Sequence, residues 1–177
     1  FSARADRQHK GLDGGIYLLD DQGRLVPEVY AVLEVIKTHD MVLATGHLST
    51  EESLALVAEA RNLGIGRVVV THATTMAFWT GMTLEDMKSL AAMGAFIEHC
   101  IHVMMPLTNR LPPRELVETI TSIGAEHCIV STDFGQDFHP MPPEGLRMGI
   151  ATLLQAGMEE VELGMLVKDN PSRLLGL

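Results

Sequence analysis

Short apolar runs that alternate with amphipathic stretches limit most strongly how this chain can fold. Four runs, at 41–47, 67–72, 95–100 and 128–133, are rich in apolar residues and are bounded by turn residues. Continuous apolar runs of this length are typical of strands buried on both faces of a parallel sheet. The stretches between them are long enough for helical crossovers, so the pattern predicts βαβ units and an α/β fold.

Helix start and stop signals separate these runs. Ser49 and Glu52 have capping-box spacing, and Gly64 follows the amphipathic stretch that they open. Residues 1–14 are polar without a period and predict an opening loop, and the apolar arms around Asp-Gln-Gly within 16–26 predict a hairpin. Helices are predicted at 27–39, 50–63, 84–93, 113–123, 144–156 and 159–168, with a short turn at 171–176, and loops at 74–82 and 101–111.

Length and composition favour one globular domain over residues 1–177, with 1–40 as its opening part and 41–177 as its βα units. The net charge of −10 argues against nucleic acid as a partner, and no apolar run is long enough to cross a membrane. The two cysteines, Cys100 and Cys128, are expected to be buried reduced thiols. We therefore expect a cytoplasmic protein that takes a small-molecule substrate, with a homo-oligomer as a possibility.

Polar residues end three of the predicted strands. His47, His72 and Asp133 occupy these positions. Since parallel strands gather their C-terminal ends on one face, where ligands bind in α/β folds, the three side chains are expected to converge. Zinc takes histidine nitrogen and aspartate oxygen, and a catalytic site leaves one position for water. Asp133 is the candidate for accepting the proton of that water; the alternative is that each residue is a hydrogen-bonded structural one.

Further candidates lie near these strand ends. Glu98 shares one side of its strand with Phe96 and Cys100, and a carboxylate on a buried strand needs a partner, so Glu98 is a second catalytic candidate. Gln136 and His139 follow Asp133 and are candidates for substrate binding.

Two alternatives concern neighbouring residues. A zinc cluster of His99, Cys100 and His102 is disfavoured, since consecutive strand residues point to opposite faces. Met76 and Trp79 follow His72, and they either form a wall of the pocket or pack in the core.

The order of TGHLS (45–49), VVVTHA (68–73) and STDFG (131–135) resembles the C-terminal half of the amidohydrolase superfamily. The segment GAEHCIVSTDFG and the tail DNPSRLLGL resemble its amidohydrolase-related branch. The resemblance implies a metal-dependent TIM barrel, of which this chain supplies roughly strands five to eight. It also implies one or two divalent metal ions, with zinc as the expected ion and His47, His72 and Asp133 as ligands.

The same resemblance implies a hydrolase that acts on a small amide, lactone or ester through a metal-activated water. A metal-dependent decarboxylase of the same superfamily is one alternative, and a non-catalytic barrel that serves as a binding or assembly module is another. The sequence departs from the family because it has no His-x-His motif and no clear bridging Lys or Glu. A complete barrel needs about 200 residues or more, so the first four strands are expected to precede Phe1.

Overall fold

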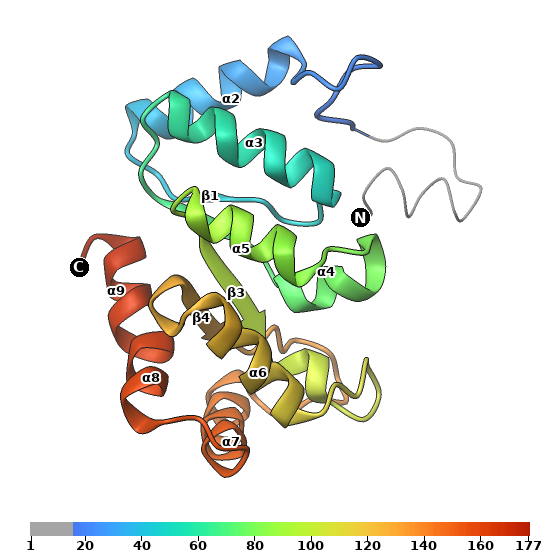
Figure 1. The fold of residues 1–177 in the computed structure, drawn as a ribbon, viewed down its shortest axis with the longest axis vertical. Coiled ribbons are helices and arrows are strands. Elements are labelled where there is room, and N and C mark those ends of the chain that lie inside the picture. Colours follow the sequence, from blue (N-terminus) through green and yellow to red (C-terminus); the bar gives the residue numbers. More distant parts are fainter. Residues whose placement is uncertain (1–15) are drawn as a thin grey trace.

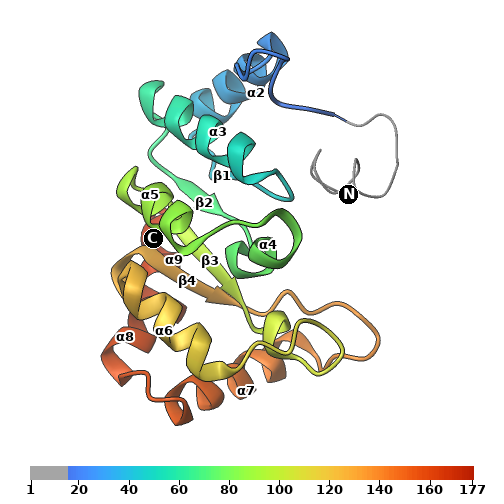
Figure 2. The ribbon, with the colours of Figure 1, turned by 45° about the vertical axis from the view of Figure 1, so that its right-hand side comes forward.

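A four-stranded parallel sheet forms the centre of the protein, and a computed structural model describes it over residues 16–177 (Figure 1). The strands are β1 (Leu43–Ala44), β2 (Val68–Val70), β3 (Phe96–Cys100) and β4 (Cys128–Ser131). They lie in the order β1-β2-β3-β4, and each pairs in parallel with the next (Figure 2). The predicted α/β fold with a parallel sheet is confirmed, although the paired strands are shorter than the apolar runs that contain them.

Helices connect the strands at most of the predicted places. They are α2 (Pro27–Thr38), α3 (Thr50–Asn62), α4 (Ala73–Thr80), α5 (Leu84–Ala92), α6 (Pro113–Ile123), α7 (Pro142–Gln155), α8 (Glu160–Gly164) and α9 (Asn170–Leu175), with the short helical turns η1 (Ile101–Met104), η2 (Ala125–His127) and η3 (Met165–Asp169). The loop predicted at 74–82 is wrong for most of its length, because α4 occupies it. This segment has no polar face to give a helical period, and its first four residues are buried by tertiary packing.

Local sequence signals explain where the connecting helices begin. The Ser49 side chain accepts a hydrogen bond from the Glu52 N–H, and the Glu52 carboxylate accepts one from the Ser49 N–H. Thr83 and Asp86 form the same reciprocal pair before α5. These caps satisfy backbone donors that the first helical turn leaves free, so each helix begins at a defined distance from its strand.

The two faces of the sheet are covered unequally. Helices α3, α5 and α6 lie over one face (Figure 1). On that face Val68, Val70 and Ile97 are at most 1% exposed. Residues of the opposite face are less covered, since Ala44 is exposed and Glu98 is partly exposed. The main core therefore lies between the sheet and one layer of helices.

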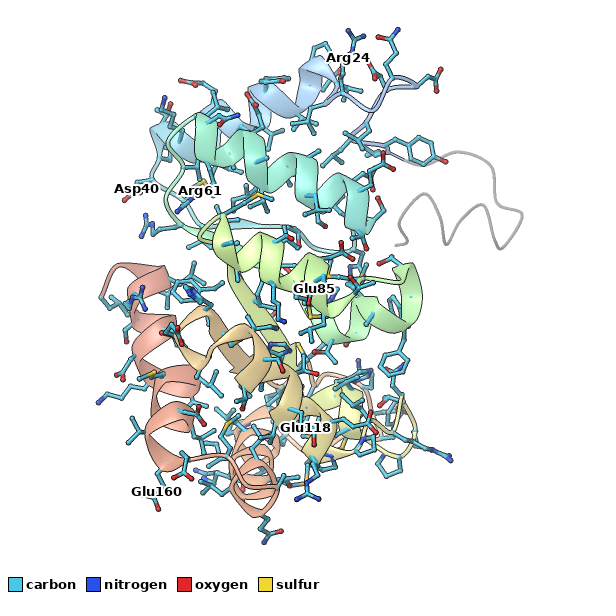
Figure 3. The ribbon with its side chains drawn as sticks, viewed as in Figure 1. Arg24, Asp40, Arg61, Glu85, Glu118 and Glu160 are labelled. Atoms are coloured by element: carbon cyan, nitrogen blue, oxygen red, sulfur yellow. The ribbon has the colours of Figure 1, made fainter. Side chains whose placement is uncertain are left out.

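Charged side chains occupy the outer surface of that helical layer. Glu85 and Glu118 are exposed on α5 and α6 (Figure 3). Their placement leaves the helix faces toward the sheet apolar, as with Leu90 and Leu116, which are fully buried.

The start of β4 is clamped by a buried residue far along the chain. Asn170 is 1% exposed, and its side-chain amide donates to the carbonyl oxygens of Ala125 at 2.8 Å and Cys128 at 2.7 Å. The C-terminal helices are thereby tied to the edge of the sheet.

The predicted hairpin lies within the described residues. Around Asp20 the chain forms the small hairpin, with an antiparallel bridge between Leu19 and Leu25. The opening loop 1–14 lies outside the described residues. Within residues 16–177, no helix has both the length and the apolar character that a membrane span requires.

Candidate metal-binding site at the strand ends

Left-handed backbone conformations end three of the four strands. Gly46 has φ of 59°, His72 of 36° and Asp133 of 53°. For residues with a side chain this conformation costs about 1–2 kcal/mol, and such strain tends to persist where function requires it. Two of the three predicted metal ligands are thus held in a strained conformation that turns the chain sharply at the rim.

His47 and His72 come together as the sequence predicts. Their Nε2 atoms are 3.2 Å apart and their ring centroids 4.4 Å apart. The contact is a hydrogen bond if one ring carries its proton on Nε2. The distance between the two Nε2 atoms also fits two ligands of one zinc ion, because two nitrogens at tetrahedral positions on one zinc lie about 3.3 Å apart.

A reciprocal pair of threonines holds the two histidine-bearing strand ends together. The Gly46 N–H donates to Thr71 Oγ1 at 3.1 Å, and the Thr71 N–H donates to Thr45 Oγ1 at 3.1 Å. These bonds extend the β1–β2 pairing past the last ladder bond. They fix the backbone directly before both His47 and His72, which preorganises the pair.

Glu98 has a structural partner at the same rim. Its Oε2 atom accepts a hydrogen bond from the His72 N–H at 2.9 Å. The bond crosses from β3 to the strained turn after β2, and it satisfies a donor that the turn would otherwise leave free. Glu98 thus orients His72; its direct role in chemistry stays a prediction.

The surroundings of the two imidazoles differ. His72 is 5% exposed, and its Nδ1 atom is buried without a hydrogen-bond partner among the described residues. His47 is exposed and stacks on Trp79, with ring centroids 5.8 Å apart. Trp79 is half-exposed and forms a wall beside His47, whereas Met76 is 2% exposed and belongs to the core.

Asp133 lies near the histidines without completing a ligand set. Partial burial lowers the pKa of His47, the charge of His72 lowers it further, and the negative charge of Asp133 opposes both. Across residues 16–177, no three His, Cys, Asp or Glu side chains form a group that could hold a metal ion. The structure therefore brings His47 and His72 together and leaves Asp133 exposed beside them.

The two predicted substrate-binding residues, Gln136 and His139, contact each other through their side chains. His139 Nδ1 lies 2.6 Å from Gln136 Oε1, on the loop after β4. The ring of His102 lies 5.0 Å from that of His139, in an edge-to-face arrangement. His102 lies two residues after the end of β3, as His72 does after β2, and this shared position is the sequence signal that could have identified it.

Burial lowers the pKa of His102, the charge of Asp133 raises it, and the charges of His139 and His72 lower it further. Asp133 is therefore close enough to influence both His47 and His102. The rim carries four imidazoles, from His47, His72, His102 and His139, and the carboxylates of Glu98 and Asp133.

The disfavoured cluster of His99, Cys100 and His102 has its members in different surroundings. His99 is fully buried, and its Nδ1 atom is 2.5 Å from Thr74 Oγ1 on the helical side of the sheet. Cys100 is 2% exposed and contacts Ser131, with 3.3 Å between Sγ and Oγ. Both cysteines are free and buried, as predicted.

Fold and rim together define an α/β protein with an imidazole-rich site at the carboxyl edge of a parallel sheet. The chain belongs to a family of unknown function (DUF6282), whose model matches residues 1–98. The match includes His47, His72 and Glu98 and ends before Asp133. No curated protein matches the chain.

Proposed function

We propose that the protein is a metal-dependent hydrolase that acts on a small amide, lactone or ester through a metal-activated water. The observation that carries the proposal is the 3.2 Å separation of His47 Nε2 and His72 Nε2 at the carboxyl edge of the sheet. It matches the spacing of two imidazoles on one zinc ion, about 3.3 Å. The likeness to the amidohydrolase superfamily supports the same reaction class.

We further propose that the four strands are consecutive strands of a TIM-like barrel. Their order follows the chain without reversal, whereas a doubly wound sheet reverses its order at a switch point. Right-handed crossovers in this order place the connecting helices on one face, as α3, α5 and α6 lie in Figure 1. The less covered opposite face then corresponds to the interior of a barrel.

The free edge of β1 supports the barrel as well. A mainly apolar groove of about 550 Å³ lies beside this strand, with walls from α2 and α3. Val32 and Val35 of α2 are 58% and 54% exposed nearby. A further parallel strand and helix beside β1 would cover these apolar side chains and pair the open strand edge.

Each rim residue then has a role that its position supports. His47 and His72 would hold the metal, and Glu98 would keep His72 in place through its backbone. A bound divalent ion supplies a water that ionises near neutral pH. Asp133, exposed beside the pair, would take the proton of that water, which is the usual task of a general base.

The substrate would lie over the rim, between the Trp79 ring beside His47 and the loop that carries Gln136 and His139. Both positions lie at the carboxyl edge of the sheet, from which side chains can reach one ligand. This placement leaves the substrate class open among small amides, lactones and esters.

Metal analysis of the purified full-length protein tests the proposal. Metal content is expected to drop on His72→Ala and to remain unchanged on His39→Ala, which alters an exposed histidine at the end of α2. Equal metal content in the two variants would contradict the assignment of His72.

A screen of carboxylate-bearing amides and lactones follows, with His72→Ala as the inactive control. Metal-dependent release of CO₂ from the same substrates would favour a decarboxylase. Bound metal with no turnover of any substrate would favour a binding module.

A further inference from the structure

The ring of His139 is held on several sides. It stacks on Phe134 with centroids 4.2 Å apart, and Phe138 meets it at 4.5 Å. Its backbone N–H donates to the Gln136 carbonyl at 3.0 Å. Together these contacts fix the orientation of the ring, at a cost in side-chain conformational entropy.

The hydrogen bonds of Gln136 determine where the proton of His139 lies. Gln136 Oε1 accepts from the Gly135 N–H at 3.1 Å, which identifies this atom as the oxygen. His139 Nδ1, 2.6 Å from the same oxygen, must therefore be the donor. In the neutral ring, Nε2 then carries a free lone pair. Metal-binding histidines show this arrangement, with the far nitrogen donating to an oxygen.

His102 presents a second nitrogen from a fixed turn. The backbone N–H of His102 donates to the Thr132 carbonyl at 3.1 Å, and the backbone carbonyl of His102 accepts a hydrogen bond from the Thr108 hydroxyl. These bonds hold the turn after β3 against the end of β4. The Nδ1 atom of His102 is nevertheless buried without a partner among the described residues, as is the Nε2 atom of His139.

Two buried, unpartnered nitrogens on adjacent rings are costly. A buried polar atom without a hydrogen bond destabilises the folded protein, because it has lost its contacts with water and gained no partner in exchange. The rings are 5.0 Å apart and nearly perpendicular, at 89°. Two imidazoles on one tetrahedral zinc have ring centres about 5 Å apart, given the usual metal–nitrogen distance. A bound ion would satisfy both atoms at once.

We propose that His102 Nδ1 and His139 Nε2 are ligands of a second divalent metal ion, of the kind that prefers imidazole, on the loops after β3 and β4. Water would fill its remaining positions, because no group of three protein ligands occurs within residues 16–177. Zinc, nickel and copper suit imidazole, whereas magnesium prefers oxygen. The site is separate from the His47–His72 pair and does not require that pair to bind metal.

Zn²⁺ titration of the full-length protein, followed by calorimetry and by ¹⁵N resonances of the histidine rings, tests this site. The metal-free protein is expected to show His139 with its proton on Nδ1. In a His47→Ala/His72→Ala background, Zn²⁺ is expected to bind one site and to shift the ring resonances of His102 and His139. Mg²⁺ at the same concentration is expected to shift neither.

Single substitutions then assign the ligands. In that background, His102→Ala or His139→Ala is expected to weaken Zn²⁺ binding at least about tenfold, and Gln136→Ala roughly tenfold through loss of ring orientation. His39→Ala is the matched control and is expected to change nothing. Because Gln136 is exposed, its variant tests the site with little risk to folding.

The outcomes separate this site from the proposed catalytic one. One outcome is that, as single substitutions, His102→Ala abolishes Zn²⁺ binding while His47→Ala retains it. That result supports the second site and counts against the catalytic pair. Zn²⁺ lost on His47→Ala, with no shift of the His102 or His139 rings, overturns the second site and leaves the catalytic pair standing.

Discussion

The carboxylate of Glu98 accepts a 2.9 Å hydrogen bond from the backbone N–H of His72, so the end of β3 holds the strained turn at the end of β2. The bond joins two candidate site residues through a backbone atom. It gives Glu98 an orienting role that can be separated from a catalytic one by experiment.

Replacing Glu98 by Gln or Ala tests that role. Glu98→Gln keeps an acceptor oxygen, so metal affinity and thermal stability are expected to remain close to wild type. Glu98→Ala leaves the His72 N–H unpaired and should reduce the free energy of unfolding by about 1–3 kcal/mol. Denaturant unfolding and metal titration measure both. A Gln variant that binds metal normally yet has no turnover would show that Glu98 also acts in catalysis.

The hydrogen bonds of Thr45 and Thr71 between β1 and β2 predict that losing the Thr71 hydroxyl lowers stability and metal affinity. Thr71→Val has nearly the same shape but removes the acceptor of the Gly46 N–H, so it is expected to destabilise the protein by about 1–3 kcal/mol. Zn²⁺ affinity should fall with it, because Gly46 directly precedes His47. Thr121→Val, at an exposed position of α6, is the control and is expected to stay within about 0.5 kcal/mol of wild type.

Asp133→Asn separates proton transfer from structure. Asn tolerates the left-handed backbone conformation of this position, so the turn should persist. If Asp133 is the base, kcat should fall by roughly two orders of magnitude, with a much smaller change in metal content. Full turnover in the Asn variant, with metal bound, would remove Asp133 from the reaction.

The buried His99 predicts a loss of stability in acid. Burial lowers its pKa from 6.5 to about 4 in the folded protein. The unfolded chain therefore binds more protons as pH falls from about 6.5 to 4, and the free energy of unfolding should drop by about 3 kcal/mol over that window. Urea unfolding at several pH values measures the slope. His99→Leu should show a shallower slope over the same window, and an unchanged slope would exclude His99 as its source.

The two cysteines are expected to be inert in the folded protein. Burial raises the pKa of Cys128 to about 12 and also raises the pKa of Cys100. Since the thiolate is the reactive form, neither should react with a thiol reagent at pH about 8 until the protein unfolds. Thr121→Cys supplies an exposed thiol as a control and should react at once. Rapid reaction of two thiols in the native wild type would contradict their burial.

The pattern of apolar residues was sufficient to predict the sheet, because buried parallel strands are continuous apolar runs whereas amphipathic helices repeat apolar residues every three to four positions. It failed for α4, whose buried residues Ala73–Met76 are helical through packing and not through an amphipathic period. The meeting of His47 and His72 followed from parallel topology alone. The sequence pattern does not single out His102 as a rim residue, because Glu98 already supplies a polar side chain near that strand end; the turn η1 adds a second one. Which side chains meet at the rim also depends on their rotamers and on hydrogen bonds within the loops, and the periodicity of apolar residues does not predict either.

The clamp made by Asn170 also sets an order of events during synthesis. Its two acceptors lie 42 and 45 residues earlier in the chain. A nascent chain folds from its N-terminus as it leaves the ribosome, so β1 to β3 can assemble while the start of β4 still lacks its buried amide. Asp133 lies two residues after the end of β4, so we expect its final position on the rim to wait until Asn170 has emerged. We therefore expect the imidazole pair from β1 and β2 to form earlier in synthesis than the final arrangement of the carboxylate beside it.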